Sequence, residues 1–276
     1  MKLTFWGTRG SIPVPGPDTV RYGGNTTCLE LELAEGQKVI VDAGSGIRPL
    51  GRALCRTAPE GELFLLVTHL HWDHILGFLF FEPAFKPGWR IRVAGWPLAL
   101  KGLRNLFDSR RSDGHFPVMW DDLPGRVEAA PELEAPRFRL GQTEVSTVPL
   151  NHPQGGVGFR FQEGDQALVF ITDNELGTDS PRSFQDYVRF CRGAQVLIHD
   201  TQYLPRESAG RRGWGHSDWG QALELARRAE VPRLVLFHHE PARTDQEMDI
   251  LLAQARRAAG REVVVDAAQE GMVIEL

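Results

Sequence analysis

Cysteine is scarce in this 276-residue chain, which contains only three. Cys28, Cys55 and Cys191 are odd in number and widely separated. They therefore indicate neither a disulfide framework nor a cysteine-based metal site. We expect a protein of a reducing, cytoplasmic compartment.

Long apolar runs are also missing. No segment approaches the roughly 20 apolar residues of a membrane-spanning helix, and Met1–Trp6 resembles a strand more than a signal peptide. Only four of the 31 basic residues are lysine, and the formal net charge is −5. This charge argues against a dominant nucleic-acid-binding surface, although a local arginine patch is compatible with it. We expect no membrane contact.

What the chain does contain is apolar sequence in short runs. Hydrophobic residues make up 42% of it, enough for a large core, and no repeat, linker or low-complexity tract divides it. We expect strands near residues 3–6, 29–33, 38–42, 63–68, 90–93, 137–140, 144–148, 158–161, 167–172, 196–199, 233–237 and 262–265. We expect helices near residues 45–54, 97–106, 183–190, 218–229 and 244–258. Strands followed by helices, twice over, predict two sheets packed face to face with helices outside, in one domain of residues 1–276.

The most informative motif is T-H-L-H-W-D-H, which begins at Thr68 directly after an apolar run. Within it, His69, His71, Asp73 and His74 are side chains of the types that bind metals. Imidazole combined with carboxylate suits zinc, iron or manganese in hydrolytic sites. A polar loop with incidental histidines is the plain alternative, but the chain has only nine histidines and three lie here. The motif therefore predicts a metal centre.

Five apolar runs each end at a polar side chain of a metal-binding type. These residues are Asp42, His69, His152, Asp173 and His238. Because the ends of adjacent strands meet at one edge of a sheet, we expect the five side chains to converge, and one aspartate between two sets of ligands can bridge two metals. His239 is an alternative to His238. Adjacent strand residues face opposite sides of a sheet, and the phase of the preceding strand favours His238.

H-x-H-x-D-H is the signature of the metallo-β-lactamase superfamily of metallohydrolases, and the chain resembles that family along nearly its whole length. Asp42-Ala43-Gly44 resembles the family's strand-end D-x-G element, and His152, Asp173 and His238 follow in the family's order. The resemblance implies an α+β fold, a four-layer αβ/βα sandwich with two mixed sheets. It also implies two divalent metal ions, zinc first, with manganese or iron as alternatives.

The family pattern also assigns the ligands. It places one metal on His69, His71 and His152, and the other on Asp73, His74 and His238, with Asp173 between them. Asp42 would orient a ligand histidine through its ring N–H.

Two further segments resemble the branch containing cyclic-phosphate and nucleotide phosphodiesterases and tRNA 3′-processing nucleases. They are residues 7–11 with 21–28, and Gly215-His216-Ser217 before a predicted helix. The resemblance implies that His216 protonates a departing alkoxide and that Asp200 pairs with it, whereas His199 is structural. On the residues alone, His216 also fits a position beside a helix that Ser217 caps.

The chain departs from tRNA 3′-processing nucleases, which carry a long arm that grips tRNA. Nothing here resembles that arm, so we expect no tRNA binding. Residues 82–124 are rich in aromatics and proline and are expected to cover the site, with His115 open as a substrate contact. The plain interpretation of these aromatics is a satellite core.

The motifs predict a metal-dependent hydrolase, and the resemblance implies a dinuclear one, first of all a phosphodiesterase for a small or cyclic phosphodiester. A water bridging the metals would lose its proton near neutral pH and attack phosphorus, with Asp73, Asp200 and His216 as the catalytic residues. Two alternatives stay open. One is a thioester or lactone hydrolase on the same metals, and the other is a non-catalytic di-iron oxygen or redox sensor. The sequence leaves the substrate, the native metal and the oligomeric state open.

Overall fold

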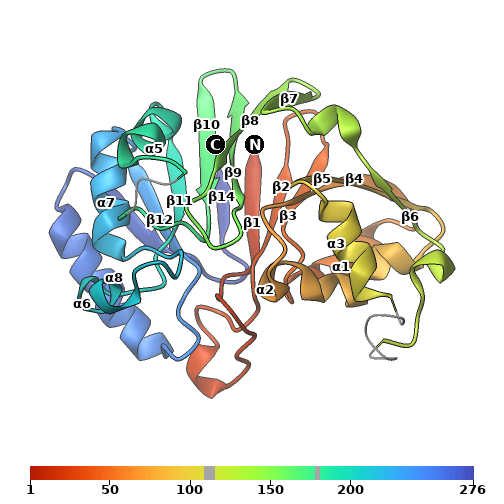
Figure 1. Cartoon of the computed structure of the whole chain (residues 1–276), viewed down its shortest axis with the longest axis horizontal. Helices are drawn as coiled ribbons and strands as arrows, with labels where there is room; N and C mark the ends of the chain where they lie inside the picture. Colours follow the sequence, from red (N-terminus) through yellow and green to blue (C-terminus); the bar gives the residue numbers. More distant parts are fainter. Residues whose placement is uncertain (109–115, 178–180) are drawn as a thin grey trace.

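The computed structural model describes residues 1–108, 116–177 and 181–276, and its strands form two seven-stranded sheets (Figure 1). The first sheet has the order β14 (Val273–Glu275), β1 (Lys2–Gly7), β2 (Cys28–Glu32), β3 (Lys38–Val41), β4 (Gly61–Val67), β5 (Trp89–Gly95) and β6 (Arg126–Ala129). The second has the order β13 (Val264–Ala267), β12 (Arg233–Phe237), β11 (Val196–Asp200), β10 (Gln166–Ile171), β9 (Val157–Glu163), β8 (Thr143–Pro149) and β7 (Arg137–Leu140). Each sheet contains both parallel and antiparallel pairs, which confirms the prediction of two mixed sheets.

Helices cover the outer faces of the two sheets. On the first sheet lie α1 (Ile47–Thr57) and α3 (Ala99–Leu106), and on the second lie α5 (Phe184–Cys191), α7 (Trp219–Arg228) and α8 (Asp245–Ala259) (Figure 1). Apolar side chains of both sheets, Phe5, Phe159, Phe170 and Phe237 among them, form a buried layer between the sheets. Two further buried clusters join each sheet to its helices. The predicted four-layer sandwich is therefore confirmed.

The second sheet illustrates why these sequences form buried strands. The consecutive parallel strands β10, β11 and β12 are nearly continuous apolar runs, because the central strands of the sheet are buried on both faces. The helices that follow begin at capping residues, as at Asp218, whose carboxylate accepts from the N–H groups of Gly220 and Gln221. The prediction that Ser217 caps this helix was wrong. Its hydroxyl donates to the carbonyl of Asn174 instead.

Two short edge strands escaped the sequence analysis. Strand β6 is a four-residue edge strand with little burial, and β14 has three residues, so neither carries a clear apolar pattern. Strand β14 pairs with β1 and brings the two termini together, where the Met1 amino group donates to the carbonyl of Leu276 (Figure 1). Strand β13 also begins two residues later than the predicted Glu262.

No helix among the described residues is long and apolar enough to cross a membrane. The part of the 68–74 motif expected to be a loop contains one turn of helix, α2 (Trp72–Ile75), which follows directly from His71. His115 lies outside the described residues.

Candidate metal centre

Unusual backbone conformations gather at one edge of the two sheets. Five of the seven described non-glycine residues with positive φ lie there: Ser11, Asp42, Gln154, Asp173 and His238, with φ of 62°, 63°, 66°, 47° and 59°. Three of them, Asp42, Asp173 and His238, directly follow or nearly follow the strands β3, β10 and β12. Left-handed backbone is costly outside glycine and persists where the surrounding structure enforces it, which is common at functional sites.

The first group of side chains combines His69, His71, His152 and Asp173, whose ligand atoms all lie within 4.8 Å of one another. His69 Nε2 and His152 Nε2 are each 3.7 Å from Asp173 Oδ2. His152 Nε2 is also 3.0 Å from His71 Nδ1. Three imidazoles and one carboxylate around a common point are a donor set that suits zinc and related divalent metals.

The second group combines Asp73, His74, His238 and the same Asp173, again with all ligand atoms within 4.8 Å. Asp173 Oδ1 is 3.1 Å from His74 Nε2 and 3.3 Å from His238 Nε2. Asp73 Oδ2 is 3.3 Å and 3.2 Å from the same two nitrogens. Asp173 thus presents one carboxylate oxygen to each group, which is the position that a bridging ligand requires.

Each of the five histidines is oriented by a partner on its outer ring nitrogen. At Nδ1, His74 donates to Asp42 Oδ2 at 2.8 Å, and His69 lies 3.0 Å from the Thr68 hydroxyl. The other three partners are Gln154 Oε1 for His71 Nε2, the Gly215 carbonyl for His152 Nδ1 and Gln202 Oε1 for His238 Nδ1. Such partners fix the tautomer, so the opposite nitrogen faces inward with a free lone pair. The sequence analysis assigned this role to Asp42 but to none of Thr68, Gln154, Gly215 and Gln202.

The donor set fits a cation on two observations. First, the inward nitrogens His69 Nε2 and His74 Nε2 are buried and have no hydrogen-bond partner among the described residues, which is costly unless another group binds them. Second, Asp42, Asp73 and Asp173 are buried together, and buried negative charge requires balancing positive charge. Divalent cations in both groups would satisfy both demands.

The pKa values of the histidines depend on burial and on the neighbouring carboxylates. Burial lowers the pKa of His69 and of His152, which favours the neutral imidazole that binds metals. Burial opposes protonation of His74 too, but the carboxylates of Asp173, Asp73 and Asp42 raise its pKa well above the ordinary value. A proton on His74 and a metal ion at its Nε2 are alternatives, because both offset the same negative charge.

His216 lies beside the second group and has its own carboxylate. Asp200 is fully buried, and its Oδ2 is 2.8 Å from His216 Nδ1. Asp200 also accepts from the backbone N–H groups of Gln202 and Asn174, which fixes it in place. The His216 ring stacks on His238 with centroids 5.1 Å apart. Burial lowers the pKa of His216, but Asp200 outweighs it and raises the value to about 9.

In the N-terminal segment and in the Gly215-His216-Ser217 segment, one glycine each lies close to a histidine of the site. A Cβ on Gly10 would lie 2.5 Å from the His238 ring, and one on Gly215 would lie 2.1 Å from His152 Nδ1. Gly215 also has a φ of 83°. Larger residues at either position would displace a candidate ligand.

Two other histidines face away from the cluster. His239 Nε2 is 2.8 Å from the Ala268 carbonyl, and burial lowers the pKa of His239 to about 3. His199 Nδ1 is 2.7 Å from the Asp200 carbonyl. Of the pair His238 and His239, it is His238 that joins the cluster.

A pocket of about 510 Å³ opens over the cluster. It is lined by Ser11, Leu70, His71, Trp72, Asp73, Gln154, Asp173, His216 and His238. None of the described residues between 82 and 124 is among them. The aromatics of that segment pack on one another, as Phe107 does on Trp120 with centroids 5.6 Å apart.

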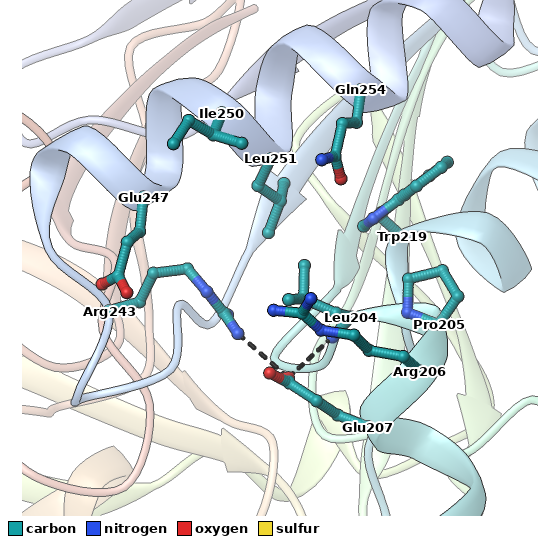
Figure 2. Close-up of a pocket in the computed structure, with 10 residues that line it drawn as sticks. All are labelled: Leu204, Pro205, Arg206, Glu207, Trp219, Arg243, Glu247, Ile250, Leu251 and Gln254. Atoms are coloured by element: carbon teal, nitrogen blue, oxygen red, sulfur yellow. Dashed lines mark hydrogen bonds and ion pairs between the residues drawn. The ribbon is translucent and has the colours of Figure 1, made fainter.

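A second pocket of about 550 Å³ lies between α8 and the short helix α6 (Pro205–Ser208) (Figure 2). Three of its charged groups are engaged: Arg243 pairs with Glu207, which also accepts from the Leu204 N–H, and Glu247 accepts from the N–H of Thr244. Arg243 further donates to the carbonyl of Gln202, the partner of His238. Arg243 therefore connects the wall of this pocket to the residue that orients His238.

Comparisons with known proteins agree with this geometry. A family model described as the beta-lactamase superfamily domain matches residues 37–239. Ribonuclease BN from Cronobacter sakazakii is 25% identical, over 93% of this chain and 94% of that protein. Among solved structures, a diphosphatase of the PhnP family has a TM-score of 0.67 at 17% identity, covering 100% of this chain and 97% of the other. The short form of human tRNase Z has a TM-score of 0.64 at 21% identity, covering 100% and 99%.

Proposed function

The chain belongs to the beta-lactamase superfamily and is a metal-dependent hydrolase, and from this premise we propose that it is a dinuclear phosphodiesterase acting on a small or cyclic phosphodiester. The observation that carries the proposal is the position of His216, which a buried Asp200 holds at the wall of the pocket that also contains the shared Asp173. A thioester or lactone hydrolase has less need of such a proton donor.

We assign the metal ligands by the two groups of side chains. His69, His71 and His152 would hold one ion, Asp73, His74 and His238 the other, and Asp173 both. Divalent ions bound here, zinc by first choice, would supply a water of low pKa as the nucleophile and neutralise charge on the phosphoryl oxygens.

The chain's own residues provide the proton. With Nδ1 donating to Asp200, His216 carries its second proton on Nε2, and the carboxylate of Asp200 raises the pKa of His216 and so favours that proton. A proton at this atom can pass to the oxygen of the departing alkoxide. Asp200 does not line the pocket, so we assign it a positioning role. Asp73 accepts from the backbone N–H of Ser11 at 2.7 Å, which fixes it as a ligand.

RNA is the second candidate substrate, because the similarity to Ribonuclease BN extends over nearly the whole of both chains. A small substrate remains our first choice, since the connection between β8 and β9, which carries His152, spans only residues 150–156. It leaves no room for a tRNA-binding arm there.

A panel of substrates tests the proposal. Protein isolated without chelator should hydrolyse bis(p-nitrophenyl) phosphate, act much less on p-nitrophenyl phosphate, and act little on a thioester or a lactone. Metal content is measured on the same sample. Thioester or lactone turnover that exceeds diester turnover on the metal-loaded protein would refute a phosphodiesterase, and preferential cleavage of a precursor tRNA would move RNA to first place.

A further inference from the structure

Trp72 is a large apolar side chain left in solvent at the mouth of the candidate site. It is 74% exposed, although tryptophan is usually well buried, and it lies in the lining of the 510 Å³ pocket. It also stands between two candidate ligands, His71 and Asp73. An exposed aromatic at the edge of a ligand pocket is typical of a surface that binds something.

The backbone holds Trp72 in a fixed place relative to the candidate metals. Trp72 is the first residue of α2, and its carbonyl accepts from the N–H of Leu76, while the carbonyl of His71 accepts from the N–H of His74. The indole is therefore attached to a hydrogen-bonded turn that also carries Asp73 and His74, two members of the cluster. A substrate group resting on the indole would lie at a defined distance from the reacting phosphorus.

The other residues that line the pocket offer few charged or hydrogen-bonding groups that could bind a substrate. Among the described residues that line it, none is lysine or arginine. Gln154 is engaged with His71 at 2.8 Å, and the Ser11 N–H with Asp73 at 2.7 Å. Trp72 is the largest side chain in this lining, and at 74% exposed most of it is free for contact with a substrate.

We propose that Trp72 is a specificity-determining residue on which a planar ring of the substrate stacks, so that the site takes nucleoside-type phosphodiesters in preference to aliphatic ones. This inference rests on the proposed phosphodiesterase function. Stacking on an aromatic side chain is sequence-tolerant, because every base has a π-face. The preference is thus for a base as such and not for one particular base.

The test compares two cyclic diesters that share the reacting group and differ in the ring: adenosine 2′,3′-cyclic phosphate and glycerol 1,2-cyclic phosphate. For Trp72→Ala we expect KM for the adenosine diester to rise about tenfold or more, in line with the usual strength of base stacking, with kcat little changed. KM for the glycerol diester should stay constant. Trp72→Phe should restore most of the affinity. Trp214→Ala serves as the matched control, because Trp214 is 61% exposed but does not line the pocket.

Two further measurements on the same samples separate stacking from loss of metal and from loss of a contact between subunits. Metal content should be equal in wild type and variants, and sedimentation velocity should give one size for all. Equal losses on both diesters, no loss on either, or a smaller species for Trp72→Ala would each overturn the role assigned to Trp72.

Failure of the proposed function gives a different result. In that case the metal-loaded wild type would hydrolyse neither diester. Calorimetry of adenosine 5′-monophosphate binding then tests the stacking role of Trp72 independently of hydrolysis. Binding by the wild type that Trp72→Ala weakens about tenfold supports the stacking surface, whereas equal or absent binding overturns it.

Discussion

The two halves of the chain supply the candidate metal ligands in different ways. In the first half, His69, His71, Asp73 and His74 lie within six positions, at the end of β4 and in α2. In the second half, His152, Asp173 and His238 come one at a time from the ends or connections of three strands. The first set depends on one local turn, and the second depends on the register of a whole sheet.

Neither of the two groups that share Asp173 is completed by one half of the chain alone. The first group joins His69 and His71 to His152, and the second joins Asp73 and His74 to His238. Asp173, from the second half, is common to both. The site therefore forms only where the edges of the two sheets meet, and the shared aspartate is the residue on which both halves depend.

The largest effect should follow from removing that shared residue. Asp173→Ala takes away negative charge from both groups, so we expect metal content to fall at both positions and hydrolysis to fall to background. His239→Ala is the matched control from the same half. It removes a buried histidine outside the cluster and should leave metal content largely intact. Loss of metal from His239→Ala but not from His238→Ala would mean that the wrong member of this pair has been assigned.

A large but selective effect is expected at His216, which the second half supplies for proton transfer. His216→Ala should keep its metals and lose about 10²–10⁴-fold in kcat on an alkyl diester such as a cyclic nucleotide. The loss should be smaller on bis(p-nitrophenyl) phosphate, because nitrophenolate departs without protonation. Equal losses on both substrates would indicate that His216 binds the phosphoryl group instead, and no loss on either would leave it as a residue beside a helix.

The smallest effects compare the outer partners of the two halves. Asp42 orients His74 with a buried carboxylate, and Gln202 orients His238 with a neutral amide. We expect Asp42→Asn to weaken metal binding by about 10–100-fold, and Gln202→Ala to weaken it by about tenfold. Competition with a chelator of known affinity measures both, with the exposed Gln142→Ala as the control. A larger loss for Gln202→Ala than for Asp42→Asn would contradict the greater weight given to the buried carboxylate.

How well the sequence predicted the site also differs between local features and features that depend on the folded chain. The motif at 68–74 stood out because its candidate ligands are adjacent, and His152, Asp173 and His238, which the structure brings together with them, stood out because each follows an apolar run. The partners Gln154, Gly215 and Gln202 were not predicted, since only the folded chain brings them to a histidine, and the role of Thr68, which adjoins His69 in the sequence, was not predicted either. Strands β6 and β14 were missed because a short edge strand buries little and shows no apolar pattern.

The proposed cap at Ser217 failed for a related reason. Serine and aspartate are both good capping residues, and only the position of Asn174, far away in sequence, shows that the Ser217 hydroxyl is already engaged. Local preference gave the correct helix but the wrong capping residue.

The number of metal ions per chain tests the central claim most directly. Protein isolated without chelator is analysed for metal, stripped, and titrated with zinc under calorimetry. We predict two equivalents per chain in the isolated protein and two binding events on titration, both lost in Asp173→Ala. A reproducible single equivalent, with no second site occupied at excess zinc, would contradict a dinuclear site.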